Sequence, residues 1–118
     1  MAIERRSDPR VPAYRPIRLQ RLGTPQVVET LTKNLGMGGV RCISSTLLPV
    51  SSEVNVELVL STGEELVTAR GRAVWFQMIP HSEQFDVGIA FLELHVTNKR
   101  RLSAYIDRLS SHLAKVPA

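Results

Sequence analysis

Residues 54–60 read Val-Asn-Val-Glu-Leu-Val-Leu, with an apolar side chain at every second position. Successive side chains of a β-strand point to opposite faces, so this alternation predicts a strand with one buried face and one solvent-facing face. Turn-forming residues separate further stretches that we expect to be strands: 17–20, 27–33, 40–43, 66–78 and 85–91. The pattern predicts an all-β protein built from short antiparallel strands.

The apolar period changes only after residue 96. Apolar side chains then recur at the spacing of an amphipathic helix, for which Thr97 is available as the N-cap, and we expect this helix to span 97–114. A parallel sheet needs a crossover between strands, which strands followed by one terminal helix do not supply. We therefore expect residues 17–116 to form a small six-stranded antiparallel β-barrel of the split-barrel type, with one C-terminal α-helix packed on one opening.

Residues 1–16 are interpreted as an N-terminal arm. Residues 1–16 contain three prolines and no repeating apolar face, so we expect them to be extended and mobile when no ligand is bound. Residues 1–21 hold six arginines and two acidic residues, and so account for the whole net charge of +4. A neutral body with an arginine-rich arm favours one localised anion site and argues against a nucleic-acid binder, which more often spreads charge over a face.

Composition excludes several other classes. The chain has 118 residues, 43% of them apolar, which is typical of one globular domain. No segment has the length and hydropathy of a membrane span or a secretory signal, so we expect a cytoplasmic protein without membrane insertion. Cys42 is the single cysteine, and the three histidines lack ligand-type spacing, so we expect no metal site. No nucleophile elbow, phosphate loop or paired-carboxylate motif indicates an enzyme.

Two clusters carry residues suited to a ligand. Arg6 and Arg10 stand four apart, directly preceded by Arg5, and guanidinium groups match phosphate oxygens and the acceptor edge of guanine. The stretch 34–39, Asn-Leu-Gly-Met-Gly-Gly, is expected to form the turn before the strand at 40–43. Its asparagine can pair with a base edge, and its glycines permit either close approach of the backbone or positive φ.

The order of these clusters resembles that of the PilZ domain family, bacterial receptors for cyclic di-GMP. The family pattern has an arginine pair with three residues between, then an aspartate or asparagine, a serine two residues on and a glycine three further. Val74-Trp75 and the strand Gly88-Ile89-Ala90-Phe91 also match the family, and the resemblance covers roughly residues 4–110. The positions that correspond to the two main motifs are Arg6, Arg10, Asn34, Gly36 and Gly39.

The resemblance implies a role for each matching residue. Arg6 and Arg10 would clamp phosphate and guanine, Asn34 would read a guanine edge, and Gly39 would permit close approach. Arg5 resembles an arginine that stacks on guanine in members that bind an intercalated ligand dimer. Gly36 departs from the family serine, and the lost hydroxyl would weaken binding by about 0.5–1.5 kcal/mol without abolishing it.

The resemblance further implies a signalling receptor whose arm orders over the ligand, so that a separate effector protein reads the changed surface. The alternative is a PilZ-like protein-interaction adaptor, related to motility or pilus machinery, that does not bind the nucleotide. A third hypothesis is a small nucleic-acid-binding barrel, which would show broad, salt-dependent affinity for DNA or RNA. The oligomeric state, the partner and the ligand stoichiometry stay open.

Overall fold

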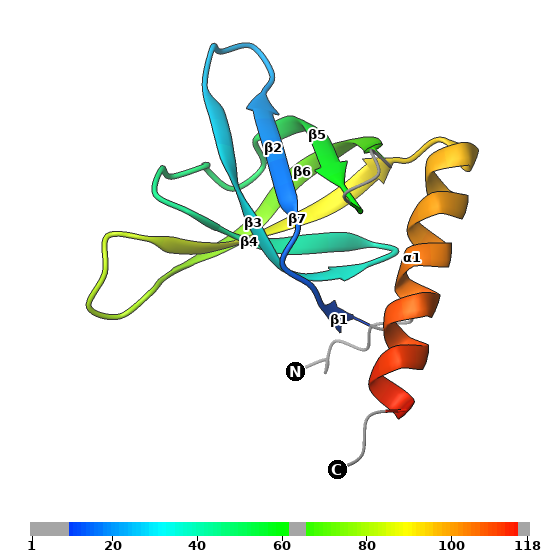
Figure 1. The fold of residues 1–118 in the computed structure, drawn as a ribbon. Helices are drawn as coiled ribbons and strands as arrows, with labels where there is room; N and C mark the ends of the chain where they lie inside the picture. The colour runs from blue at the N-terminus through cyan, green and yellow to red at the C-terminus, as the bar shows by residue number, and fades with distance from the viewer. Residues whose placement is uncertain (1–9, 62–65, 116–118) are drawn as a thin grey trace, which may run out of the picture.

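The computed structural model describes residues 10–61 and 66–115. In these residues seven strands precede one helix (Figure 1). The strands are β1 (Val11–Pro12), β2 (Pro16–Arg21), β3 (Val27–Gly36), β4 (Gly39–Ser44), β5 (Glu53–Val59), β6 (Leu66–Met78) and β7 (Phe85–Glu93), and the helix is α1 (Val96–Lys115).

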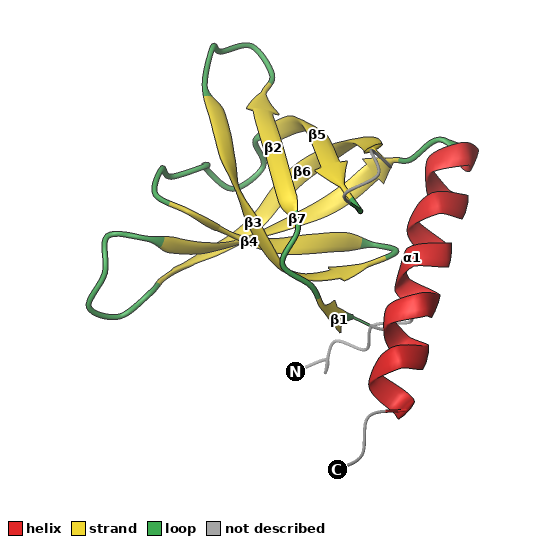
Figure 2. Ribbon diagram, in the orientation of Figure 1, coloured by secondary structure: helices red, strands yellow, loops and turns green. Residues whose placement is uncertain are grey.

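Six of the strands close into a barrel. Their order is β3-β2-β5-β6-β7-β4, every pairing is antiparallel, and β4 pairs back with β3 to complete the circuit. The short β1 adds to the free side of β3. The predicted fold class, a six-stranded antiparallel barrel with one C-terminal helix, is confirmed (Figure 2).

The core follows from the alternation of the strands. Apolar side chains on the inner face are almost fully buried in every barrel strand, as in the inward-facing Val54, Val56 and Leu58 of β5. The helix α1 lies beside the barrel and packs on β6 and β1, burying Leu102 and Ile106 (Figure 1). Burial of a Leu or Ile side chain contributes about 1.5–3 kcal/mol, so these two residues anchor the helix.

The helix begins one residue earlier than predicted, and its cap is not Thr97. The N-cap is His95, whose Nδ1 accepts a hydrogen bond from the backbone N–H of Thr97 at 3.2 Å. The carbonyl oxygen of His95 accepts the first helical hydrogen bond, from Lys99 N at 2.8 Å. Because the imidazole already satisfies an N–H of the first turn, a hydroxyl cap at Thr97 is not needed.

The turn between β3 and β4 is shorter than the predicted stretch 34–39. Only Met37 and Gly38 form it, because the ladder continues to the Gly36–Gly39 pair. A Cβ on Gly39 would overlap the carbonyl oxygen of Ile89 on β7. Close approach of two strands, and not positive φ, is therefore what requires glycine at this position.

The end of the predicted arm is packed on β3. Val11 and Ala13 are buried, and the Thr32 hydroxyl donates to the carbonyl oxygen of Ala13 at 2.6 Å. The same hydroxyl accepts from the backbone N–H of Arg15 at 2.9 Å, so this buried polar group is satisfied in both directions. Arg5 and Arg6 lie outside the described residues, and the mobility of the arm stays a prediction.

Candidate ligand-binding site

The structure brings together two of the residues that the sequence predicted for the site. Arg10 lies directly before β1, and β1 pairs with the end of β3, where Pro12 stands opposite Asn34. The guanidinium of Arg10 donates from NH1 to Oδ1 of Asn34 at 3.1 Å. The last residue of the arginine motif therefore contacts the first residue of the glycine-rich motif, although 24 positions separate them in the chain.

The two glycines of the second motif lie at the turn end of the β3–β4 hairpin. Gly36 is the last residue of β3, Gly39 is the first of β4, and they stand opposite each other. Both are buried. Gly36 is two residues after Asn34 and so shares its face of β3. A serine at this position would project its hydroxyl on the side of the Asn34 amide.

A row of residues crosses four strands on the outer face of the barrel. Asn34 of β3 stands opposite Arg41 of β4, Arg41 stands opposite Gly88 of β7, and Gly88 stands opposite Trp75 of β6. Residues directly opposite in antiparallel strands project to the same face. A Cβ on Gly88 would overlap the indole of Trp75, so the ring lies over this glycine. We call Asn34, Arg41, Gly88 and Trp75 the outer row.

One nearly buried carboxylate holds two cations beside the outer row. Asp86 Oδ2 accepts from Arg41 at 2.6 Å and Oδ1 accepts from Lys33 at 3.0 Å, while the Asp86 side chain is only 11% exposed. Lys33 lies at an irregularity of the β3–β4 register between Thr32 and Asn34, and such bulges change the direction of a side chain. The bulge accounts for a lysine that reaches from β3 to a carboxylate on β7.

The charge of this cluster is positive. Burial of Asp86 raises the pKa of its carboxyl, but hydrogen bonds and charge from Arg41 and Lys33 outweigh burial, and the net effect lowers the pKa. The carboxylate is therefore ionised at neutral pH. Two cations share one anion, and Arg10 adds a further guanidinium at the end of the row, beside Asn34. This face of the barrel suits an anionic ligand.

Sequence reasoning missed the cluster of Lys33, Arg41 and Asp86. A usable signal was present in the glycine-rich stretch. Once the turn is restricted to Met37 and Gly38, strand alternation places Arg41 directly opposite Asn34. The partner Asp86 had no comparable local signal, because the β4–β7 register decides which side chain of β7 meets Arg41.

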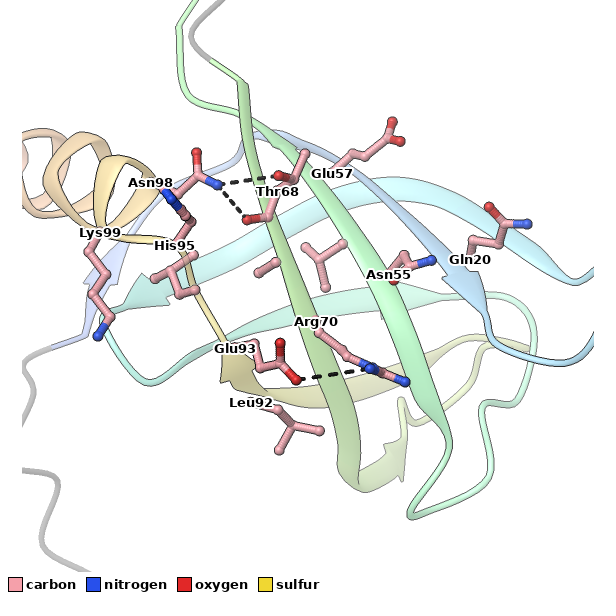
Figure 3. A pocket seen from close by; sticks show the side chains of 13 residues that line it. Gln20, Asn55, Glu57, Thr68, Arg70, Leu92, Glu93, His95, Asn98 and Lys99 are labelled. Atoms are coloured by element: carbon pink, nitrogen blue, oxygen red, sulfur yellow. Dashed lines mark hydrogen bonds and ion pairs between the residues drawn. The ribbon is translucent and has the colours of Figure 1, made fainter.

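A depression lies on another part of the surface, between the barrel and the start of α1 (Figure 3). There Arg70 lies 3.1 Å from Glu53 and 3.9 Å from Glu93, and Asn98 donates to the carbonyl oxygen of Thr68 at 2.9 Å. We call it the α1 groove; its lining includes Gln20, Asn55, Glu57, Thr68, Arg70, Leu92, Glu93, His95, Asn98 and Lys99. Its lining carries two carboxylates and two cations, and so offers no excess positive charge to a ligand with two phosphates.

Metal and thiol chemistry find no support in the part of the chain that the structure describes. Within residues 10–61 and 66–115 no three His, Cys, Asp or Glu side chains are grouped to hold a metal ion. The thiol of Cys42 is buried, and burial raises its pKa to about 12, so it is protonated and unreactive at neutral pH. None of the described helices is long and apolar enough to cross a membrane.

The sequence profile of the PilZ domain matches residues 4–108. The chain therefore belongs to the PilZ domain family, which confirms the resemblance drawn from its motifs.

Solved structures that share its fold include the following three. The complex of MrkH from K. pneumonia with c-di-GMP has a TM-score of 0.80 at 19% identity, covering 96% of this chain and 56% of that chain. MotI (DgrA), the inhibitor of motility of Bacillus subtilis, has a TM-score of 0.79 at 19% identity, covering 97% and 54%. The PilZ domain of YcgR from Escherichia coli with c-di-GMP has a TM-score of 0.72 at 16% identity, covering 96% and 100%.

At these identities the likeness establishes the fold alone. The chain spans about half the length of the MotI and MrkH chains that it matches. Comparison with curated protein sequences gives no match.

Proposed function

We propose that this chain is a receptor for cyclic di-GMP that acts in the cytoplasm without catalysing a reaction. The observation that carries the proposal is the hydrogen bond from Arg10 to Asn34, which joins the two motifs at one place on the barrel. The positive cluster beside Asn34 supports it, since the ligand carries two phosphates. Two proteins with the same fold, MrkH and the PilZ domain of YcgR, have structures with c-di-GMP.

The contact between Arg10 and Asn34 also suggests how guanine is read. Oδ1 of Asn34 accepts from Arg10, so the amide nitrogen Nδ2 is left to donate. The guanine edge offers the acceptors O6 and N7, which an amide N–H and a guanidinium both match. Arg10 thus fixes the amide orientation in addition to contacting the ligand itself.

The remaining site residues complete the proposal. Arg6 clamps phosphate and guanine together with Arg10, Arg5 stacks on a guanine of a second ligand molecule, and Gly36 and Gly39 border the ligand without side chains. The part of the arm that precedes its attachment on β3 orders over the ligand. An effector protein then reads the changed surface.

Calorimetric titration with cyclic di-GMP tests the proposal, with GMP as the control ligand. We expect saturable binding of cyclic di-GMP, with GMP weaker by at least tenfold. Limited proteolysis of the same samples tests the arm: cleavage between Arg5 and Arg15 should slow when cyclic di-GMP is present. Absence of any heat of binding at ligand concentrations in the millimolar range would refute the receptor function.

The second candidate function is a protein-interaction adaptor that binds no nucleotide. Apolar side chains at the end of β6 favour it, because Val74, Phe76 and Met78 are 43%, 43% and 63% exposed. Exposed apolar side chains that gather on one hairpin mark interaction surfaces. Gly36, which lacks the family hydroxyl, points the same way. The titration separates the two functions, since the adaptor predicts no binding of cyclic di-GMP.

A further inference from the structure

We infer that Arg41 is an additional ligand-binding residue of the site, which contacts a phosphate of the dinucleotide with a guanidinium besides those of Arg5, Arg6 and Arg10. This inference rests on the proposed function. It arises from the register of the barrel: Arg41 stands directly opposite Asn34 in the β3–β4 ladder. Side chains opposite each other on antiparallel strands have Cβ atoms about 4.5–5.5 Å apart. A ligand that contacts the amide of Asn34 is therefore within reach of the Arg41 side chain.

The Arg41 side chain is held in place before any ligand binds. NH2 of Arg41 lies 2.6 Å from Oδ2 of Asp86, and its guanidinium carbon lies 5.8 Å from the centroid of the Trp75 ring. An ion pair with a nearly buried carboxylate and a cation–π contact together restrict the rotamers of a long side chain. A pre-positioned arginine loses less conformational entropy when it binds a phosphate.

Arg41 retains donors for a ligand although it is paired. Its side chain is 37% exposed, and a guanidinium has five N–H donors. Its Nε is buried without a hydrogen-bond partner among the described residues, so the barrel satisfies only part of this donor set. Lys33 also pairs with Asp86, at 3.0 Å, so this carboxylate keeps a second cation when Arg41 shares its remaining donors with a phosphate.

Substitution of Arg41 by glutamine tests the inference in a calorimetric titration with cyclic di-GMP. We expect Arg41→Gln to weaken binding about tenfold to hundredfold, as for the loss of a hydrogen bond to a charged group. The matched control is Arg18→Gln. Arg18 also lies on a barrel strand, with 40% side-chain exposure and an ion pair 3.8 Å long to Glu57, and its loss should change affinity less than twofold.

The single tryptophan offers a second readout. Because Trp75 lies over Gly88 and beside the Arg41 guanidinium, engagement of Arg41 by the ligand should change its fluorescence. The change should be present in the wild type and in Arg18→Gln, and much smaller in Arg41→Gln even at saturating ligand. An equal change in Arg41→Gln would contradict direct contact.

The double variant Arg41→Gln/Asp86→Asn separates ligand binding from a structural role. If Arg41 served only to neutralise Asp86, removal of the carboxylate would restore wild-type affinity; we expect the double variant to stay at least tenfold weaker than the wild type. Restoration, or wild-type affinity in Arg41→Gln, would overturn the inference. If the wild type binds cyclic di-GMP and Arg10→Ala binds it more weakly, that outcome refutes only the role of Arg41. If the wild type binds no cyclic di-GMP, both the proposed function and this inference are refuted.

Discussion

Arginine side chains lie on two sides of the barrel, in the α1 groove and in the outer row. Beside the α1 groove Arg70 and Arg72 lie near the carboxylates of Glu53 and Glu93, so two cations face two carboxylates. Beside the outer row cations are in excess, because Arg41 and Lys33 share the single carboxylate of Asp86. The ratio of cations to carboxylates, and not the presence of an arginine, therefore indicates which side accommodates an anionic ligand.

The largest difference is expected when one arginine is removed on each side and the two losses of affinity are compared. Arg10→Ala should weaken binding of cyclic di-GMP by about 2–5 kcal/mol, which is at least about 30-fold, because a desolvated charge contact is lost and the orientation of the Asn34 amide is no longer fixed. Arg70→Ala should leave the affinity within twofold. Calorimetry on both variants checks the pair, and equal losses would contradict the assignment of the ligand to the outer row.

An intermediate effect is expected on stability from Asp86→Asn. The carboxylate accepts hydrogen bonds from two cations, so its loss should lower the free energy of unfolding at pH 7 by about 1.5–3 kcal/mol. In contrast, Glu93→Gln in the α1 groove removes an exposed partner 3.9 Å from Arg70 and should cost less than about 1 kcal/mol.

The pH dependence of the same variant follows from the lowered pKa of Asp86. Its folded pKa lies below the ordinary value of 3.8, so the carboxylate stabilises the folded state fully above that value and loses this effect as the pH falls through the folded pKa. The difference in unfolding free energy between the wild type and Asp86→Asn should be largest at neutral pH and shrink below pH 3.8. Urea unfolding at a series of pH values measures it, and a difference that grows in acid would have the wrong sign.

The smallest effect is expected from restoring the family hydroxyl. Gly36→Ser should strengthen binding by about 0.5–1.5 kcal/mol, or about threefold to tenfold, because a hydroxyl is added on the face of β3 that carries Asn34. The added Cβ lies on a buried residue, so thermal unfolding of the variant should be recorded beside the titration. Weaker binding by a variant of unchanged stability would show that the ligand does not pass beside Gly36.

The strands were predictable from the sequence because a barrel buries every second side chain, and residues 54–60 display that period without interruption. Part of the candidate site was predictable from local motifs, since Asn34 and Arg10 each belong to a short recognisable sequence pattern. The shared carboxylate was not predictable, because Asp86 lies 45 residues from Arg41 and 53 from Lys33 in the sequence. The strand register and the bulge at Lys33 bring the three side chains together. The cap at His95 was missed because it depends on a side-chain orientation that spacing does not encode.

The most direct test of the account is an NMR titration that follows side-chain N–H signals while cyclic di-GMP is added. We predict that the side-chain amide of Asn34 and the guanidinium N–H groups of Arg10 shift together and saturate, while those of Asn98 and Arg70 in the α1 groove stay unchanged. Shifts confined to Asn98 and Arg70, or no shift on either side, would contradict it.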